Sequence, residues 1–439
     1  MNKKILDLAI PNIISNISIP LLGIVDMALM GHLESDAFIG AIALGSLIFN
    51  FIYWSLGFLR MGTSGFTAQA WGRRDLPETV LVFSRAAFIA VFTGAILLLL
   101  QKPIEILSFL VLKGETQVEE LAMAYFRIRI WAAPAALGQF ALLGFFLGMQ
   151  NAKLPMVVLV STNVINIACS YFFVMQLALE SNGVALGTVI AQYCGLLIAL
   201  FYFRKYFRRL FKYWSLQATL QWDKLKHFLL INKDIFIRTM CLVVVFSIFT
   251  ARSASSDVQN NGEDTILAVN SLLMQFFMFF SFLIDGFAHA SEALSGKFIG
   301  ARDRISLKRA VRLLFIWGGG ISILFTLIYL LGGNGILRML TNNAEVIANA
   351  RPYFFWVVLV PMLSFTAFLW DGIFIGATAG PEMRNAMLVS TLAVFFPVYI
   401  LAGRFMGNHG LWLAFILFMI ARGLSMQVIA KKAVWSKMG

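Results

Sequence analysis

Ionisable side chains inside long apolar stretches are the residues of this sequence best suited to chemistry. Asp26 lies in IVDMALMGHL, and Asp371 lies in FLWDGIFIGAT. A third stretch contains Asp285, His289 and Glu292 at i, i+4 and i+7. A charged side chain at the centre of a bilayer costs about 2.5–3.5 kcal/mol on insertion scales, so such residues are functional candidates by default.

The position of Asp26 suggests exchange of a proton for a cation. Pro20 lacks a backbone N–H and should kink the helix, and Ser15, Ser18 and Asp26 fall near one helical face. A carboxyl group facing a cavity with little water binds a proton when the cavity is empty and loses it when a cationic compound arrives. The alternative is a structural carboxylate at the outer end of its span.

Neutral polar residues could assist such a carboxyl group. Asn166 and Ser170 are one helical turn apart, and Thr188 lies in the next apolar stretch. Each can hydrogen-bond a carboxyl group and so tune its affinity for a proton. The alternative is ordinary polar packing, because hydrogen-bonding side chains also join membrane helices.

The series Asp285, His289 and Glu292 falls on one helical face, and this spacing could bind a divalent metal ion. Such a site would indicate an intramembrane metalloenzyme. The chain has no HExxH motif and only four histidines. We therefore expect a protein that is not an enzyme and that holds no metal or other cofactor.

Buried charges need partners. Asp371, with the nearby residues Asp234 and Arg238, indicates a charge network between helices, either structural or part of a second ion site. Arg60, in FLRMGTSG, either pairs with a carboxylate or extends toward a cytoplasmic cavity. Aromatic residues such as Tyr53 could line a pocket for flat organic cations.

The composition indicates that lipid is the solvent for most of the elements that position these residues. Of 439 residues, 60% are hydrophobic and 13% are charged, and the mean hydropathy is +0.82; soluble chains contain about 25% charged residues. Only helices or closed barrels satisfy the backbone inside a bilayer, and long unbroken apolar runs exclude a barrel. We predict an all-α membrane protein.

The apolar runs predict twelve transmembrane helices. Their approximate limits are 8–32, 37–70, 84–110, 121–148, 155–178, 183–206, 227–251, 265–298, 310–332, 346–376, 384–406 and 409–431. The first is expected to be a retained helix, because no small-residue cleavage site follows it.

The charged residues predict the orientation. The two ends and the even-numbered connections contain most of the lysines and arginines, whereas the odd-numbered connections are rich in acids. By the positive-inside rule both termini should be cytoplasmic, in the cell inner membrane. The net charge of +13 then belongs to loops near anionic lipid, so we expect contacts with membrane lipid and none with nucleic acid.

The sequence repeats itself after about 228 residues. Asp75 falls on Asp303 and Gly148 on Gly376, and the string LVST occurs at 159–162 and again at 388–391. Six spans separate equivalent positions, so the two halves should share one orientation, as in transporters that use alternating access. We predict an N-terminal six-helix lobe at 1–205, a basic cytoplasmic linker at 206–226 and a C-terminal lobe at 227–439.

Several motifs resemble those of the multidrug and toxic compound extrusion (MATE) family, specifically its DinF-like branch. They are IVDMALMGHL in span one, FLRMGTSGFTAQAWG in span two, DGFAHASEALSGKFIGARD in span eight and WDGIFIGAT in span ten. The resemblance covers essentially the whole chain. It implies a V-shaped pair of pseudo-symmetric six-helix lobes and export of cationic or amphipathic compounds, driven by protons or sodium.

The resemblance also assigns roles to single residues. It implies that Asp26 is the span-one carboxylate, Asn166 the span-five asparagine and Asp371 the span-ten acid. Members with a proton site in the first lobe often have an acid one turn after that asparagine, where this chain has Ser170. This departure leaves open coupling through the second lobe, at Asp371, Asp285 or Glu292.

We therefore predict a monomeric antiporter that exports small organic compounds in exchange for H⁺, possibly Na⁺. Proton or substrate coupling is assigned to Asp26, Asn166, Ser170 and Thr188, and a second ion site or charge network to Asp371, Asp285, His289, Glu292 and Arg60. A related flippase for lipid-linked precursors is the alternative, with Arg60, Arg127, Arg129 and Arg238 as candidate contacts for a pyrophosphate headgroup.

Overall fold

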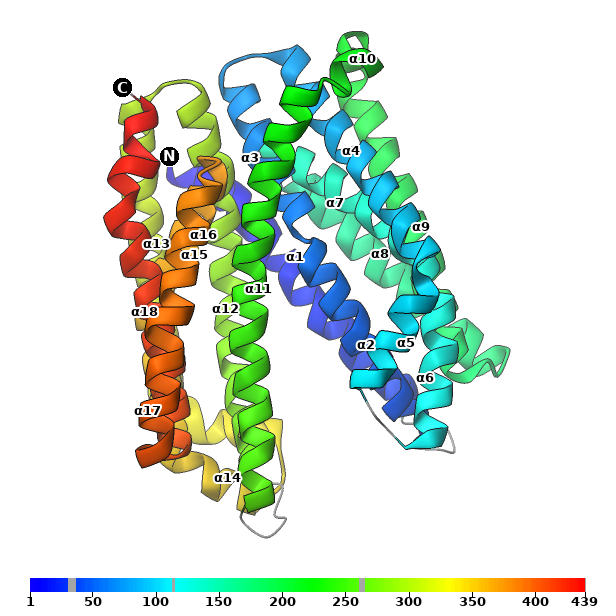
Figure 1. The fold of residues 1–439 in the computed structure, drawn as a ribbon, viewed down its shortest axis with the longest axis vertical. Coiled ribbons are helices and arrows are strands. Elements are labelled where there is room, and N and C mark those ends of the chain that lie inside the picture. Colours follow the sequence, from blue (N-terminus) through cyan, green and yellow to red (C-terminus); the bar gives the residue numbers. More distant parts are fainter. Residues whose placement is uncertain (31–36, 113–114, 260–264, 439) are drawn as a thin grey trace. The chain divides into compact units, whose positions relative to one another are not determined.

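The chain folds into α-helices, and this computed structural model describes residues 1–30, 37–112, 115–259 and 265–438 (Figure 1). Twelve segments of the described part are long and apolar enough to cross a membrane, and each overlaps a predicted span. The predicted all-α membrane fold is confirmed. The largest shift is in the third span, which runs from Leu76 to Leu99 because Asp75 and Pro77 begin the helix earlier than hydropathy indicates.

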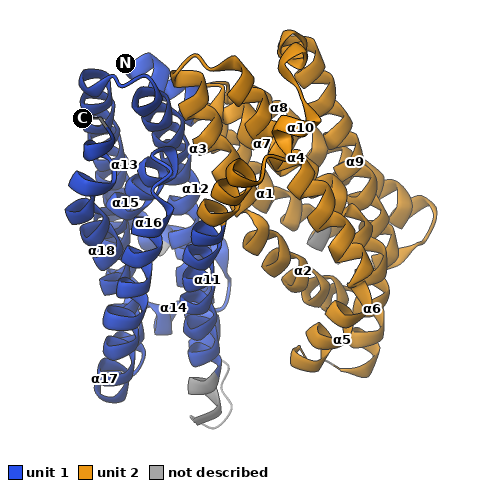
Figure 2. Cartoon of the chain, turned by 45° about the horizontal axis from the view of Figure 1, so that its top comes forward, with its two compact units in different colours: residues 1–9, 233–439 blue, residues 10–232 orange. Residues whose placement is uncertain are grey.

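Two compact units make up the chain (Figure 2). Residues 10–232 form one, here called the N-unit, and residues 1–9 with 233–439 form the other, here called the C-unit. The basic segment 206–226, predicted as a linker, lies within the N-unit.

The N-unit contains most of α1, all helices from α2 to α10, and the first residues of α11 up to residue 232. Their bounds are α1 (Asn2–Met30), α2 (Ala37–Leu56), α3 (Phe58–Gly72), α4 (Leu76–Leu99), α5 (Gln101–Val111), α6 (Thr116–Arg129), η1 (Ile130–Ala132), α7 (Ala133–Gly148), α8 (Lys153–Tyr171), η2 (Phe172–Gln176), α9 (Glu180–Phe207), η3 (Arg208–Tyr213) and α10 (Leu216–Thr219). Span two is thus divided at Gly57 into α2 and α3, where glycine weakens helical continuity.

The C-unit contains the remaining helices. Their bounds are α11 (Trp222–Gln259), α12 (Thr265–Gly300), α13 (Arg304–Leu340), α14 (Ala344–Ala350), η4 (Arg351–Tyr353), α15 (Phe354–Gly376), α16 (Gly380–Leu388), η5 (Val389–Phe395), α17 (Phe396–Met406), α18 (Asn408–Ala433) and η6 (Trp435–Met438). Aromatic rings fill its core: Phe277 packs edge-to-face against Phe415, with ring centroids 5.1 Å apart.

The same helix start occurs once in each unit. The Asp75 carboxylate accepts a hydrogen bond from the Glu78 N–H at the start of α4, and Asp303 accepts one from the Ser306 N–H at the start of α13. The hydrogen bonds from Ser306 hold the pKa of Asp303 below its usual range. The residues just before them, Arg74 and Arg302, have φ of 60° and 54°. The duplicated sequence therefore builds a duplicated turn.

Glycines repeat a close helix contact. A Cβ on Gly144 in α7 would lie 2.4 Å from the Arg60 carbonyl oxygen in α3, and one on Gly372 in α15 would lie 2.1 Å from the Ala288 oxygen in α12. Each residue of the second pair is 228 positions after its counterpart in the first pair. Small residues let membrane helices approach backbone to backbone, so the same contact joins α3 to α7 and α12 to α15.

A partly exposed ion pair joins α5 to α6. The Arg127 guanidinium donates to the Glu105 carboxylate, with Nη2 2.6 Å and Nε 3.1 Å from Oε1. This hydrogen bonding holds the pKa of Glu105 below its usual range. The bidentate geometry gives the pair more specificity than a single contact would.

Replacement of Gly372 by alanine should destabilise the C-unit by about 1–3 kcal/mol, because the added methyl overlaps backbone of α12. The matched control is Gly320→Ala in α13, where a Cβ has no neighbour within 4 Å. Thermal unfolding in detergent should show a lower Tm for Gly372→Ala alone. Equal Tm values for the two variants would contradict the close contact.

Glu105→Gln should cost about 1 kcal/mol of stability at pH 7. Because the folded pKa is lowered, the contribution is present above the ordinary glutamate pKa of about 4.3 and is lost as pH falls through the folded value. The Tm difference from the parent should therefore shrink in acid. Glu120→Gln, at an exposed position of α6, should show neither the loss nor its pH dependence.

Candidate functional site

A neutral polar cluster lies inside the N-unit. The Asn166 Nδ2 donates to Thr188 Oγ1 at 3.1 Å, and the Ser170 hydroxyl donates to Asn166 Oδ1 at 3.1 Å. All three residues are buried. The structure thus brings together Asn166, Ser170 and Thr188, which the sequence singled out from two separate spans.

A close approach of α9 to α8 makes this cluster possible. A Cβ on Gly187 would lie 2.7 Å from Ser170 Oγ and 2.8 Å from the Ser170 backbone nitrogen. Only glycine allows this separation, which brings Thr188 within hydrogen-bonding distance of Asn166.

One helical turn before Asn166, a further asparagine of α8 joins this helix to α1. Asn163 Nδ2 donates to the Ser18 hydroxyl at 2.9 Å and to its carbonyl oxygen at 3.2 Å. Ser15, one turn before Ser18, is buried and donates to the Pro11 carbonyl oxygen. The side chain of Asp26, the predicted coupling carboxylate, lies outside the described residues.

A charge cluster occupies the interior of the C-unit. One carboxylate oxygen of Asp371 in α15 accepts hydrogen bonds from Arg238 in α11 and from Arg422 in α18. Asp371 is 4% exposed, Arg238 7% and Arg422 2%. The other carboxylate oxygen of Asp371 has no hydrogen-bond partner among the described residues. Asp371 therefore joins three helices through one atom.

The neighbouring acid Asp234 has a different partner. Its Oδ1 lies 2.6 Å from Arg384 Nη1 in α16, whereas Arg238, one turn later, turns to Asp371. The network predicted from Asp371, Asp234 and Arg238 thus consists of two separate ion contacts. Arg422 was missed by the sequence reasoning, although a lone arginine in the middle of an apolar span was a visible signal.

Asp285, His289 and Glu292 lie along the part of α12 that packs on α15. Asp285 accepts a hydrogen bond from Ser281 at 3.3 Å and lies within electrostatic reach of both arginines of the cluster and of His289. His289 Nδ1 is 3.5 Å from Glu292 Oε2. Glu292 is 1% exposed, and its Oε1 has no hydrogen-bond partner among the described residues.

The balance of charge in this interior is close to zero. Arg238 and Arg422 contribute two guanidinium groups, and Asp371, Asp285 and Glu292 contribute three carboxyl groups. With the carboxyl groups counted as ionised and His289 as neutral, the formal sum is one negative charge. A single proton, or one monovalent cation, would neutralise the cluster.

The structure does not join the three residues of the α12 series into a metal site. Within residues 1–30, 37–112, 115–259 and 265–438, no three histidine, cysteine or acidic side chains are grouped so that they could hold a metal ion. His289 Nδ1 instead lies 3.5 Å from Glu292 Oε2, and Asp285 interacts electrostatically with Arg238 and Arg422.

The predicted cation Arg60 is half-buried in α3 and has no ion-pair partner in the described part of the chain. A second arginine of the N-unit, Arg129, has several described contacts. Arg129 donates to Tyr125 and to Ser46, and its guanidinium lies 4.9 Å from the centroid of the Phe49 ring. The Tyr53 hydroxyl is buried without a described hydrogen-bond partner. The N-unit interior therefore combines aromatic rings with positive charge.

The polar groups of the two units do not occupy equivalent positions. With the 228-residue repeat, Asp371 corresponds to Leu143 and Arg422 to Cys194. With the LVST repeat, which is one residue longer, Asn166 corresponds to Phe395. The duplicated frame is shared, but each unit contains a polar cluster that the other lacks.

Comparisons with known proteins agree with this architecture. The MatE family model matches residues 11–172 and 236–401. DNA damage-inducible protein F of Escherichia coli (strain K12) is 38% identical over 431 residues, which are 98% of this chain and 92% of that protein. Protein DETOXIFICATION 45, chloroplastic, of Arabidopsis thaliana is 24% identical over 83% of this chain and 62% of its own length.

A solved structure described as the outward-facing conformation of a multidrug resistance MATE family transporter of the MOP superfamily has the same fold. Its TM-score is 0.88 at 17% identity, over 99% of this chain and 96% of that chain. The predicted relationship is confirmed. This chain belongs to the MatE family of multidrug and toxic compound transporters, as a relative of DNA damage-inducible protein F.

Proposed function

We propose that this chain is a secondary antiporter that exports small organic compounds, cationic or amphipathic, in exchange for protons by alternating access. Sodium is the alternative coupling ion. The proposed protein acts as a monomer in the cell inner membrane, with both termini cytoplasmic and with no cofactor or enzyme activity. Its substrate class is supported by family membership and by a relative named multidrug and toxin extrusion protein 1, from Oryctolagus cuniculus.

The observation that carries proton coupling is the Glu292–His289 pair. Glu292 has one carboxylate oxygen near His289 and the other without a described donor, in a position that is almost completely buried. An imidazole beside a carboxyl group forms a pair that can share one proton. Uptake of that proton would neutralise the charge cluster around Asp371.

The same cluster favours a proton over sodium. The Asp371 carboxylate already contacts two fixed guanidinium groups. A metal cation placed beside it would be repelled by both, and this repulsion is strong where water is scarce. A proton needs only one free oxygen.

Asp26 is the second proposed coupling group. The N-unit, to which Asp26 belongs, also contains Asn166, Ser170 and Thr188 as a preformed hydrogen-bonded set, which could bind a carboxyl group or a polar substrate. In this proposal a cationic substrate and a proton compete for Asp26. Inward movement of a proton gains about 2.3 kcal/mol per 100 mV of membrane potential, which can drive export against a gradient.

The flippase alternative is weakened by the pairing of its candidate cations. Arg127 is bound to Glu105, Arg238 is bound to Asp371, and Arg129 stacks on Phe49. A pyrophosphate headgroup needs cations free to bind it bidentately. Of the four candidates, Arg60 alone has no described partner.

Replacing Glu292 with glutamine should abolish proton-driven export of a cationic dye from proteoliposomes, because the amide cannot exchange a proton.

Asp26→Asn tests the second proposed coupling carboxyl in the same assay. The control is Glu345→Gln, an exposed acid at the start of α14, which should transport as the parent does. Full activity of both Glu292→Gln and Asp26→Asn would refute the proposed coupling groups. If neither a proton gradient nor a sodium gradient drives export by the parent, antiport is refuted.

Asp371→Asn should lower stability by about 3–5 kcal/mol, since it leaves two buried guanidinium groups without their counter-charge. Adding Arg422→Met should restore part of that loss, because it removes one of the two unpaired charges. Unfolding of the single and double variants in detergent measures this coupling. Additive losses would show that the ion contacts contribute little.

A further inference from the structure

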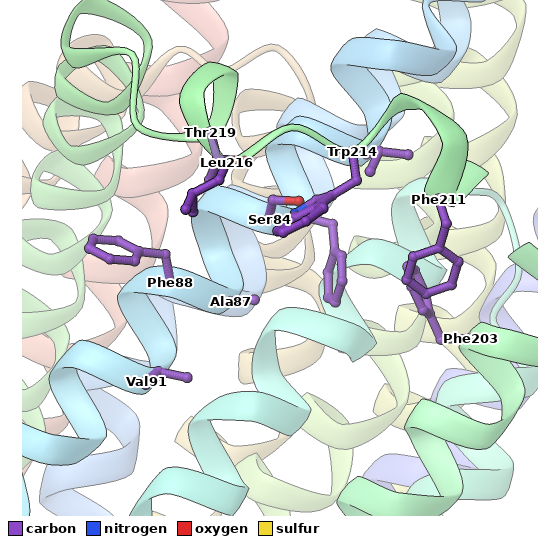
Figure 3. A pocket seen from close by; sticks show the side chains of 11 residues that line it. Ser84, Ala87, Phe88, Val91, Phe203, Phe211, Trp214, Leu216 and Thr219 are labelled. Carbon is purple, nitrogen blue, oxygen red and sulfur yellow. The ribbon is translucent and has the colours of Figure 1, made fainter. Parts of the chain in front are cut away.

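An apolar groove of about 540 Å³ lies in the N-unit between α4 and the segment that follows α9 (Figure 3). This volume is in the range of small-molecule sites, about 300–1,000 Å³. Its lining is almost entirely hydrophobic and comes from Val80, Phe83, Ser84, Ala87, Phe88 and Val91 of α4, from Phe203 of α9, from Phe211 of η3, and from Trp214, Leu216 and Thr219. The groove contains no residue of either polar cluster.

Hydrogen bonds fix the wall opposite α4. Ser215 caps α10 by accepting from the Ala218 N–H, and the Thr219 hydroxyl donates to the Ser215 carbonyl oxygen. Arg85, which is 2% exposed, donates to Glu78 at 2.7 Å and to the Ala218 carbonyl oxygen at 3.4 Å. The segment is therefore tied to α4, and the groove is part of the folded unit.

The open side of the groove is apolar and exposed. Phe88, Val91, Phe211, Trp214 and Leu216 are between 43% and 70% exposed. In Figure 3 the Trp214 ring lies over Ser84, with Phe88 and Val91 to one side and Phe211 to the other. Exposed apolar side chains on a membrane helix meet acyl chains, so this side suits a hydrocarbon tail.

The chain beside the groove is strongly basic. Residues 204–212 contain the exposed cations Arg204, Lys205, Arg208, Arg209 and Lys212, and no acidic residue occurs between Glu180 and Asp223. These cations lie at the end of the span that finishes at Tyr213, and the end of a span is where lipid headgroups are expected. Basic residues near a membrane surface attract anionic lipids.

We propose that this groove binds one anionic phospholipid, with an acyl chain along Phe88, Val91 and Trp214 and the phosphate near the cations of residues 204–212. A zwitterionic lipid would fill the apolar part but would gain less from the basic rim, so the charge pattern selects an anionic headgroup. The equivalent positions of the C-unit are unsuited to an acyl chain, because Lys308 and Arg312 stand where the N-unit has Val80 and Ser84.

The lipid retained by the purified full chain tests this proposal. Native mass spectrometry after exchange into mixed phosphatidylglycerol and phosphatidylcholine should show one phosphatidylglycerol bound in preference. Arg208→Gln with Arg209→Gln should weaken it about 25-fold, since each cation contributes about fivefold near a membrane surface. Lys431→Gln with Lys432→Gln removes the same charge from exposed positions of α18 and should leave binding unchanged.

A second pair of variants tests the groove itself. Ala87→Trp fills it from α4 and should expel the lipid, whereas Ala95→Trp, exposed on the same helix outside the groove, should not. Loss of binding with both Ala87→Trp and the double arginine variant supports the site. Equal retention of phosphatidylcholine and phosphatidylglycerol would overturn the proposal, and so would lipid binding that does not respond to Ala87→Trp or to the double arginine variant. Lipid binding that responds to the arginine variant alone would indicate binding to the membrane surface only.

Discussion

The contact of Asp371 with Arg238 and Arg422 sets a constraint on the whole C-unit. Burying ions costs several kcal/mol each, and the cost is offset only when opposite charges meet with good geometry. Because the three residues come from α11, α15 and α18, those helices must converge at one depth. The two contacts act on one carboxylate oxygen, so a shift of any of the three helices would break at least one of them.

The close packing of α15 on α12 places Asp371 in that position. Gly372, the next residue, lies against the Ala288 backbone, and Gly376 lies against the Glu292 carbonyl oxygen. The same glycine spacing joins α7 to α3 in the N-unit, where the residue before Gly144 is Leu143. The residue next to this shared packing contact is therefore a carboxylate, Asp371, in the C-unit and a leucine, Leu143, in the N-unit.

Much of this architecture could be predicted from the sequence, because hydropathy and the 228-residue repeat depend on many residues at once. The individual partners could not. Asp234 is one turn from Arg238 in the sequence, yet it pairs with Arg384, 150 residues away, and Arg422 joins the cluster from the last span. Side-chain direction in a bundle depends on which helices are neighbours, and a single sequence contains little information on that point. Hydropathy alone also began the third span too late and merged α4 with α5, since it detects neither the Asp75 cap at the start of α4 nor the break at Leu100 between the two helices.

Divergence after duplication has distributed the polar groups unequally. Opposite charges meet in the interior of the C-unit, where Asp371 contacts Arg238 and Arg422 and Asp285 interacts electrostatically with both arginines. Asn166, Ser170 and Thr188 in the N-unit are neutral and satisfy one another. A neutral set can accommodate varied hydrogen-bonding ligands at little electrostatic cost, whereas a charged set responds strongly to one added proton. The polar clusters of the two units thus differ in how strongly they respond to an added charge.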